Sequence, residues 1–141
     1  FVFYTNLNSS KSLDLKENPK AAMCFHWKSF NRQIRILGSV TQVEDREADL
    51  YFNSRLYESK ISAWASDQSN SMKERSEFLK KIEVFKKKYK NEKNVPRPPH
   101  WSGWCLRPLS IEFWLHKDNR IHERLRYNKI ANDWKKEILY P

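Results

Sequence analysis

Apolar and polar side chains alternate along several stretches of the chain, which is the pattern of half-buried β-strands. Residues 1–5 are aromatic and β-branched, and residues 21–27 (AAMCFHW) form a mostly apolar run, so each predicts a strand, the second mostly buried. Residues 33–43 alternate throughout, with one face formed by Ile34, Ile36, Gly38, Val40 and Gln42. Three strands so close together predict a sheet or barrel as the core.

The apolar spacing changes to a helical period in the middle of the chain. We expect a short helix over residues 12–18, stopped by Pro19, and a second helix that is capped by Asp45. A short helix is predicted over residues 60–66. A longer one is predicted over residues 71–91, with an apolar stripe formed by Phe78, Ile82, Phe85 and Tyr89.

The last third of the chain returns to strand patterning after a stiff connector, residues 95–99 (VPRPP). Its prolines exclude a helix or a central strand. Beyond it we expect a hairpin connection at residues 128–133 and strands over residues 104–109, 110–115, 123–128 and 134–140. The sequence therefore predicts a mostly β fold with flanking helices, in one domain of 141 residues.

The amino-acid composition excludes some classes of function and favours others. Only two glycines occur, which excludes a Walker loop or a glycine-rich dinucleotide fingerprint. Twenty-seven Lys and Arg against 17 Asp and Glu leave a net charge of +10, which favours an anionic partner: nucleic acid, a membrane surface or a phosphorylated small molecule.

Two cysteines, Cys24 and Cys105, lack paired spacing, so we expect a reduced, cytoplasmic protein. Cys24 and His26 share a strand face, but no second close pair accompanies them, and no metal site is predicted. No apolar run approaches the about 20 residues of a membrane span. Because the chain starts inside a predicted strand, we expect an N-terminal portion of the fold to be missing from it.

Residues 111–124 (IEFWLHKDNRIHER) carry the most concentrated chemistry. If residues 120–125 are extended, Arg120, His122 and Arg124 share one face. A guanidinium binds phosphate or carboxylate and an imidazole titrates near neutral pH, so this face suits an anionic substrate. The alternative is an edge strand whose charges prevent aggregation.

A second candidate row lies in the helical part of the chain. Tyr51, Arg55 and Ser59 are four residues apart, so a continuing helix would align three donors suited to one phosphate. The alternative is an ordinary helix surface. The lysines of residues 71–91 allow a similar pair of interpretations, a solvated face or a nucleic-acid contact.

Seven stretches, in order and spanning essentially the whole chain, resemble the pyridoxamine 5'-phosphate oxidase family, flavin enzymes of the split-barrel class. They are FVFYTN from Phe1, NRQIRILG from Asn31, YFNSRLYESKISAWASDQS from Tyr51, HWSGW from His100, IEFW from Ile111, RIHER from Arg120 and the closing NDWKKEILYP. Ser10 stands before Lys11 where the family usually has an arginine.

The resemblance implies an FMN-binding split β-barrel that is a homodimer, with dimerisation and active-site residues from about residue 95 to residue 141. It implies that Arg120 and His122 contact the substrate beside the flavin and act in catalysis, and that the substrate phosphate is held by Tyr51, Arg55 and Ser59. The residues that it assigns to FMN are Tyr4, Thr5, Lys11, Gln33, Gln68, Ser69, Trp114 and Arg124.

The activity that the resemblance implies is oxidation of pyridoxamine 5'-phosphate or pyridoxine 5'-phosphate by O2, giving pyridoxal 5'-phosphate and hydrogen peroxide, with no nucleic-acid or membrane partner. Three alternatives stay open at this point. They are another split-barrel flavoprotein with a different substrate, an inactive truncated paralogue, and a basic nucleic-acid-binding module that uses the lysine-rich helix.

Overall fold

The computed structural model describes residues 1–90 and 95–141, which form two compact units. One, here called the sheet unit, consists of Phe1, Pro19–Thr41 and Leu106–Pro141. The other, the helical unit, consists of Val2–Asn18 and Gln42–Cys105. No helix among the described residues is long and apolar enough to cross a membrane.

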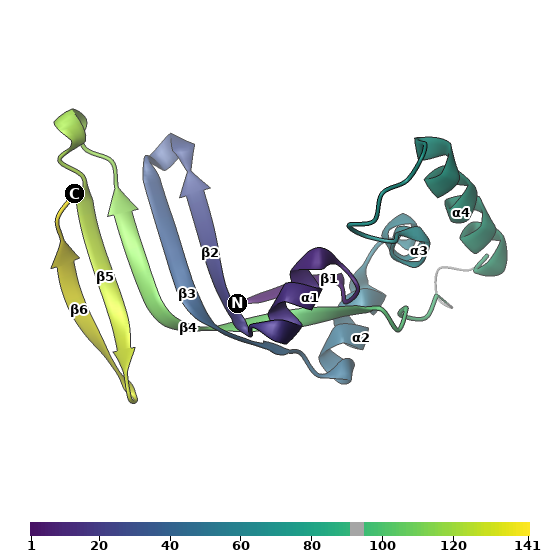
Figure 1. Ribbon diagram of the computed structural model, residues 1–141, viewed down its shortest axis with the longest axis horizontal. Helices are drawn as coiled ribbons and strands as arrows, with labels where there is room; N and C mark the ends of the chain where they lie inside the picture. Colours follow the sequence, from purple (N-terminus) through teal and green to yellow (C-terminus); the bar gives the residue numbers. More distant parts are fainter. Residues whose placement is uncertain (91–94) are drawn as a thin grey trace. The chain divides into compact units, whose positions relative to one another are not determined.

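The sheet unit is built on antiparallel pairing in the strand order β2-β3-β4-β5-β6 (Figure 1). A 3-10 turn at Lys28–Phe30 joins β2 to β3, and a tight turn with Ala131 in the left-handed region joins β5 to β6. The strand bounds are Lys20–Trp27 for β2, Arg32–Gln42 for β3, Trp101–Leu115 for β4, Glu123–Ile130 for β5 and Asp133–Leu139 for β6.

The predicted alternation along β3 is confirmed at the centre of the strand. Ile36, Gly38 and Val40 are buried, whereas Leu37 between them is exposed. At Gly38 an added Cβ would lie 2.0 Å from the carbonyl oxygen of Arg107, so only glycine permits this close approach of β3 to β4.

The helical unit places β1 (Val2–Asn6) antiparallel to the first five residues of β4. Four helices complete it: α1 (Ser10–Glu17), α2 (Asp45–Ser54), α3 (Tyr57–Ala65) and α4 (Arg75–Lys88) (Figure 1). Its core contains the buried side chains of Phe52, Ile61, Val95 and Trp101. The predicted apolar stripe of the longest helix is confirmed, since Ile82, Phe85 and Tyr89 pack against this core.

Two predictions about strands are wrong. The strands expected over residues 104–109 and 110–115 are one strand, β4, because Leu109 and Ser110 form no turn and the strand tolerates Pro108. The strand over residues 21–27 was expected to be mostly buried, yet residues 24–27 are exposed. β2 lies at the end of the strand order, and among the described residues only β3 pairs with it.

The helices near residue 50 also differ from the prediction. Asp45 lies in the first turn of α2, and the residue at the cap position is Glu44, whose side chain makes no capping bond. α2 ends at Ser54, and Arg55 is extended before α3 begins. Ser54 Oγ donates a 2.8 Å hydrogen bond to the carbonyl of Tyr51, a local bond that competes with the helix ladder.

The longest helix begins at Arg75 rather than at residue 71, and α4 ends at Lys88. The predicted end of this helix at Asn91 lies outside the described residues.

Candidate functional site

Three nearly parallel aromatic rings lie beside the end of α2 in the helical unit. The ring centroids of Tyr4 and Tyr51 are 3.9 Å apart with 9° between their planes, and those of Tyr4 and Trp101 are 5.3 Å apart with 8°. Burial raises the pKa of the Tyr4 hydroxyl, and the Glu47 carboxylate raises it further. The stack therefore presents the protonated phenol of Tyr4, which can donate a hydrogen bond, beside an apolar aromatic surface.

The Arg55 guanidinium lies over this aromatic surface, 5.0 Å from the ring centroid of Trp101 and 5.8 Å from that of Phe52. Its Nη1 is buried and has no hydrogen-bond partner among the described residues. Burial lowers the pKa of Arg55, and the neighbouring Tyr51 partly offsets this effect. A partly buried cation whose buried donor is unused is costly alone, so an anionic group that accepts from Nη1 would stabilise it.

The predicted helical row Tyr51, Arg55 and Ser59 does not exist as one row. Tyr51 lies on α2 and Ser59 on α3, with the extended Arg55 between the two helices. The structure nevertheless brings Tyr51 and Arg55 together, because both lie close to the indole of Trp101. Ser59, in the first turn of α3, is partly exposed and no contact joins it to the other two within the described part of the chain.

Of the residues expected to hold FMN in the helical unit, Thr5 and Gln68 are in direct contact, whereas Tyr4 belongs to the aromatic stack. Thr5 Oγ1 and the backbone N–H of Asn6 both donate to Gln68 Oε1, at 3.2 and 3.1 Å. Ser69 follows in the left-handed region with φ of 73°. Lys11 lies on α1, and its Nζ is 5.9 Å from the ring centroid of Phe3.

Asn6 was missed in the sequence, although it follows two residues that were selected. Its side-chain Nδ2 donates to the carbonyl of Ser66, so Asn6 fixes the start of the loop that carries Gln68 and Ser69. The feature of the sequence that could have identified Asn6 is its position in the FYTN stretch.

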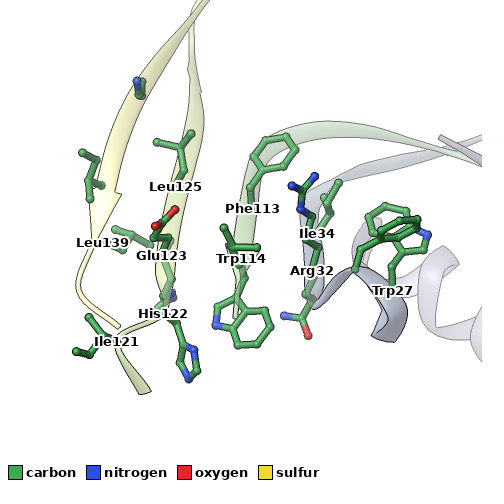
Figure 2. Close-up of a pocket in the computed structure, with 16 residues that line it drawn as sticks. Trp27, Arg32, Ile34, Phe113, Trp114, Ile121, His122, Glu123, Leu125 and Leu139 are labelled. Carbon is green, nitrogen blue, oxygen red and sulfur yellow. The ribbon is translucent and has the colours of Figure 1, made fainter. Parts of the chain in front are cut away.

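The sheet unit contains a cavity of about 900 Å³ (Figure 2). Most of its lining is apolar, contributed by side chains such as Trp27, Phe113 and Leu125. Four of the predicted site residues line it: Gln33, Trp114, His122 and Arg124. An aromatic and aliphatic wall with a few polar groups is the usual form of a site for a flat organic ligand.

Arg124 is held in the wall of this cavity from two directions. Its Nε donates to Glu112 Oε1 at 2.8 Å, and its Nη1 donates to the carbonyl of Tyr140 at 3.1 Å. The hydrogen bond to Glu112 raises the pKa of Arg124. Trp114 and Arg124 are direct partners in the register of β4 and β5. Glu112 was not selected from the sequence; nothing in the strand pattern distinguishes it from an exposed carboxylate.

His122 is oriented by the backbone of the preceding turn. The N–H of Lys117 donates to His122 Nδ1 at 3.3 Å, so the neutral imidazole carries its proton on Nε2. The His122 ring lies 4.8 Å from the ring of Trp114, and Figure 2 shows the two side by side. Nε2 is therefore the ring nitrogen that can donate a hydrogen bond to a ligand.

The prediction for Arg120 is wrong in its geometry. Arg120 ends a 3-10 turn, Asp118–Arg120, with φ of 61°, and it is exposed rather than part of a strand face. β5 begins only at Glu123, because Asn119 also adopts the left-handed region that Asn tolerates in turns. His122 and Arg124 share the cavity, whereas Arg120 is not among its lining residues.

The predicted residues therefore divide between the two units, and each unit assembles its own subset. The helical unit holds the Tyr51 and Arg55 pair and the cluster of Thr5, Gln68 and Ser69. The sheet unit holds the cavity with Gln33, Trp114, His122 and Arg124. Among residues 1–90 and 95–141, no three His, Cys, Asp or Glu side chains are grouped so as to hold a metal ion.

Comparison with known families gives two matches along the chain. Residues 1–89 match the family described as pyridoxamine 5'-phosphate oxidase. Residues 101–141 match the pyridoxine 5'-phosphate oxidase C-terminal dimerisation region. Together the two matches cover most of the sequence.

Curated relatives carry the same description. A pyridoxine/pyridoxamine 5'-phosphate oxidase of Pelagibacter ubique is 59% identical over all of this chain, which spans 68% of that relative. One of Sphingopyxis alaskensis is 48% identical, and the chain spans 65% of its length. The chain thus corresponds to about two thirds of the length of these relatives.

Two solved structures share the fold. PhzG from Burkholderia lata, in complex with tetrahydrophenazine-1-carboxylic acid, is 31% identical with a TM-score of 0.89, over 99% of this chain and 68% of that one. A pyridoxamine 5'-phosphate oxidase-related, FMN-binding protein from Nostoc punctiforme has a TM-score of 0.76 at 15% identity, over 99% of this chain and 72% of that one. The second likeness concerns the fold alone.

Proposed function

Because the chain belongs to the pyridoxamine 5'-phosphate oxidase family, we propose that it supports FMN-dependent oxidation of pyridoxine 5'-phosphate or pyridoxamine 5'-phosphate by O2. The products are pyridoxal 5'-phosphate and hydrogen peroxide, with ammonia from the amine, in vitamin B6 biosynthesis and salvage. The observation that carries this proposal is the buried Nη1 of Arg55, which has no partner among the described residues. A phosphate oxygen is the acceptor that suits it best.

The residues present fit the chemistry of FMN, the cofactor of the family. In the helical unit, Thr5, Lys11, Gln68 and Ser69 offer hydroxyl, amide and ammonium donors of the kind that bind a phosphate and a ribityl chain. In the sheet unit, the ring of Trp114, the fixed guanidinium of Arg124 and the amide of Gln33 suit a flat ring with carbonyl groups. FMN, when bound, supplies the two-electron oxidation and is regenerated by O2.

The substrate requires positioning more than acid or base chemistry from the protein. We propose that Arg55 and Tyr51 bind its phosphate, with Ser59 as a third donor. Nε2 of His122, which carries the ring proton, then donates to an oxygen of the substrate ring. Arg120 lies on an exposed turn, where its side chain can cover the substrate. We place the activity in the cytoplasm, where Cys24 and Cys105 stay as free thiols.

The experiment that tests this function is turnover of the purified, FMN-loaded chain in air with pyridoxine 5'-phosphate. We expect pyridoxal 5'-phosphate and hydrogen peroxide in equal amounts, because one two-electron oxidation reduces one O2. Tetrahydrophenazine-1-carboxylic acid, which PhzG binds, serves as the comparison substrate because Arg55 could also pair with a carboxylate. Absence of turnover with the phosphate ester, or faster oxidation of the tricyclic acid, would contradict the proposal.

We propose that the protein acts as a homodimer. Residues 101–141 match a dimerisation region, and large apolar side chains of the sheet unit are exposed, including those of Trp27, Phe30, Ile121 and Ile138. Covering them with a second copy would remove this surface from water. Sedimentation at micromolar concentration with FMN present is expected to show a dimer; a monomer alone under these conditions would count against it.

A further inference from the structure

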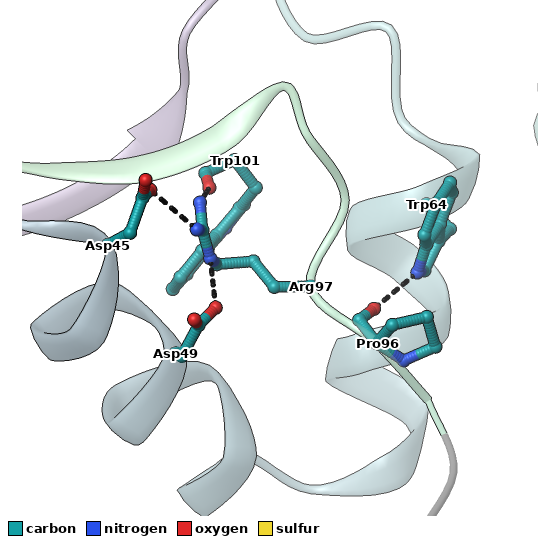
Figure 3. Close-up of polar contacts among 6 residues, drawn as sticks. All are labelled: Asp45, Asp49, Trp64, Pro96, Arg97 and Trp101. Carbon is teal, nitrogen blue, oxygen red and sulfur yellow. Dashed lines mark hydrogen bonds and ion pairs between the residues drawn. The ribbon is translucent and has the colours of Figure 1, made fainter.

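Arg97, in the proline-rich segment before β4, makes three hydrogen bonds with its guanidinium group (Figure 3). Its Nε donates to Asp49 Oδ1 at 2.5 Å and its Nη2 to Asp45 Oδ1 at 2.7 Å. Its Nη1 donates to the carbonyl of Trp101 at 2.8 Å. One side chain therefore joins the first turns of α2 to the first residue of β4.

The Arg97 side chain is only 14% exposed, whereas the carboxylates of Asp45 and Asp49 are 81% and 52% exposed. Burial alone lowers the pKa of Arg97, but the hydrogen bonds that it donates to Asp49 and Asp45 outweigh this effect and raise the pKa above its ordinary value. The ion pairs are largely hydrated, so the geometry of the guanidinium matters more than the charge. A lysine at this position could not reach all three acceptors at once.

Both elements that Arg97 joins also form the surface beneath Arg55. The indole of Trp101 lies 5.0 Å from the Arg55 guanidinium carbon. α2 carries Tyr51 in its last turn and ends at Ser54, immediately before Arg55. Because a helix of ten residues moves as a rigid rod of about 15 Å, fixing its first turn against β4 also fixes its other end.

We propose that Arg97 is a positioning residue for the phosphate of the substrate, holding α2 and Trp101 in the arrangement that places Arg55 over the indole. This inference rests on the proposed function, since it assumes that Arg55 binds phosphate. Arg97 does not touch the substrate, and its effect on binding is transmitted through Trp101 and α2.

A second hydrogen bond fixes the same segment and supplies a matched control. Trp64 Nε1, on α3, donates to the carbonyl of Pro96 at 2.8 Å, next to Arg97, and this hydrogen bond does not involve α2 (Figure 3). Loss of this bond in Trp64→Phe lowers stability without releasing α2 from β4. A residue that only holds the fold would behave in the same way as Trp64.

The test compares Arg97→Lys, Asp49→Asn, Trp64→Phe and Arg55→Ala, with KM and kcat for pyridoxine 5'-phosphate, FMN content and melting temperature measured for each. We expect Arg97→Lys to raise KM about fivefold with kcat within about twofold, the size of coupling seen between residues in one contact network. Asp49→Asn, which keeps the arginine, should raise KM in the same direction by less. Trp64→Phe should lower the melting temperature and leave KM unchanged.

The outcomes separate this inference from the proposed function. If Arg55→Ala raises KM while Arg97→Lys and Asp49→Asn leave it unchanged, Arg97 is only structural and the inference is overturned. If Arg55→Ala itself has no effect on KM, the proposed phosphate site is wrong and this inference loses its premise, whereas the oxidase activity is decided by turnover of the parent chain. If Arg97→Lys does not fold, the comparison of KM between Asp49→Asn and Trp64→Phe decides the question: a higher KM in Asp49→Asn alone supports the inference, and an unchanged KM in both overturns it.

Discussion

Replacement of Arg55 by alanine is expected to raise KM for pyridoxine 5'-phosphate by about 10- to 150-fold and to change kcat little. The loss corresponds to roughly 1.5 to 3 kcal/mol, the usual contribution of a hydrogen bond to a charged group. The phosphate is bound in the same way before and during the reaction. Losing the Arg55 contact therefore weakens binding of the substrate and of the transition state equally, and the loss appears in KM. Steady-state kinetics with saturating FMN measures both constants.

Arg46 supplies the matched control for Arg55. It is an exposed arginine on α2, the helix that precedes Arg55, so Arg46→Ala removes the same charge nearby in the chain without touching the aromatic stack. We expect its KM to stay near that of the parent. If Arg55→Ala and Arg46→Ala gave the same small change, only the net positive charge of the protein would attract the substrate, and Arg55 would face elsewhere.

Replacement of His122 by alanine is expected to lower kcat/KM for pyridoxine 5'-phosphate by more than tenfold, a loss above about 1.4 kcal/mol of transition-state stabilisation. The imidazole is fixed by the Lys117 N–H and packed on Trp114, so its Nε2 is presented to the cavity at little entropic cost. Arg120→Ala is expected to act in the same direction if this exposed side chain covers the substrate.

FMN content must be measured with these variants, because loss of flavin would imitate loss of catalysis. Arg124→Ala is the reference for that effect: it removes one of the two arginines that pair with the buried Glu112 and should empty the flavin site. His26→Ala, which replaces an exposed histidine of β2, should leave turnover unchanged. If His122→Ala kept both its flavin and near-normal kcat/KM, the cavity would not be the place where the substrate reacts.

Local periodicity was sufficient for the elements whose packing repeats along the chain. The alternation along β3 and the apolar stripe of α4 were read from the sequence because each reports one buried face of one element. Local periodicity failed to predict the places where a single side chain determines the backbone conformation. Ser54 ends α2 through its bond to Tyr51, and Asn119 extends the turn before β5. Ser59 and Arg120 therefore lie on different elements from those expected, whereas Tyr51 lies on the expected helix.

The contacts that shape the candidate site join residues far apart in the sequence. Thr5 meets Gln68 across 63 positions, and Arg97 meets Asp45 across 52. No periodic pattern encodes such pairs, and only the resemblance to a family selected Thr5 and Gln68 beforehand. Arg97 was selected by neither route, since in the sequence it is one arginine among the many basic residues of this chain.

The central claim is that Arg55, a partly buried arginine of the helical unit, binds the phosphate of the substrate. The most direct test is the ratio of kcat/KM for pyridoxine 5'-phosphate to that for unphosphorylated pyridoxine, in the parent chain and in Arg55→Ala. We expect a large ratio in the parent chain, which falls at least tenfold in Arg55→Ala because only the phosphorylated substrate loses a contact. An equal loss with both substrates, leaving the ratio unchanged, would contradict the claim.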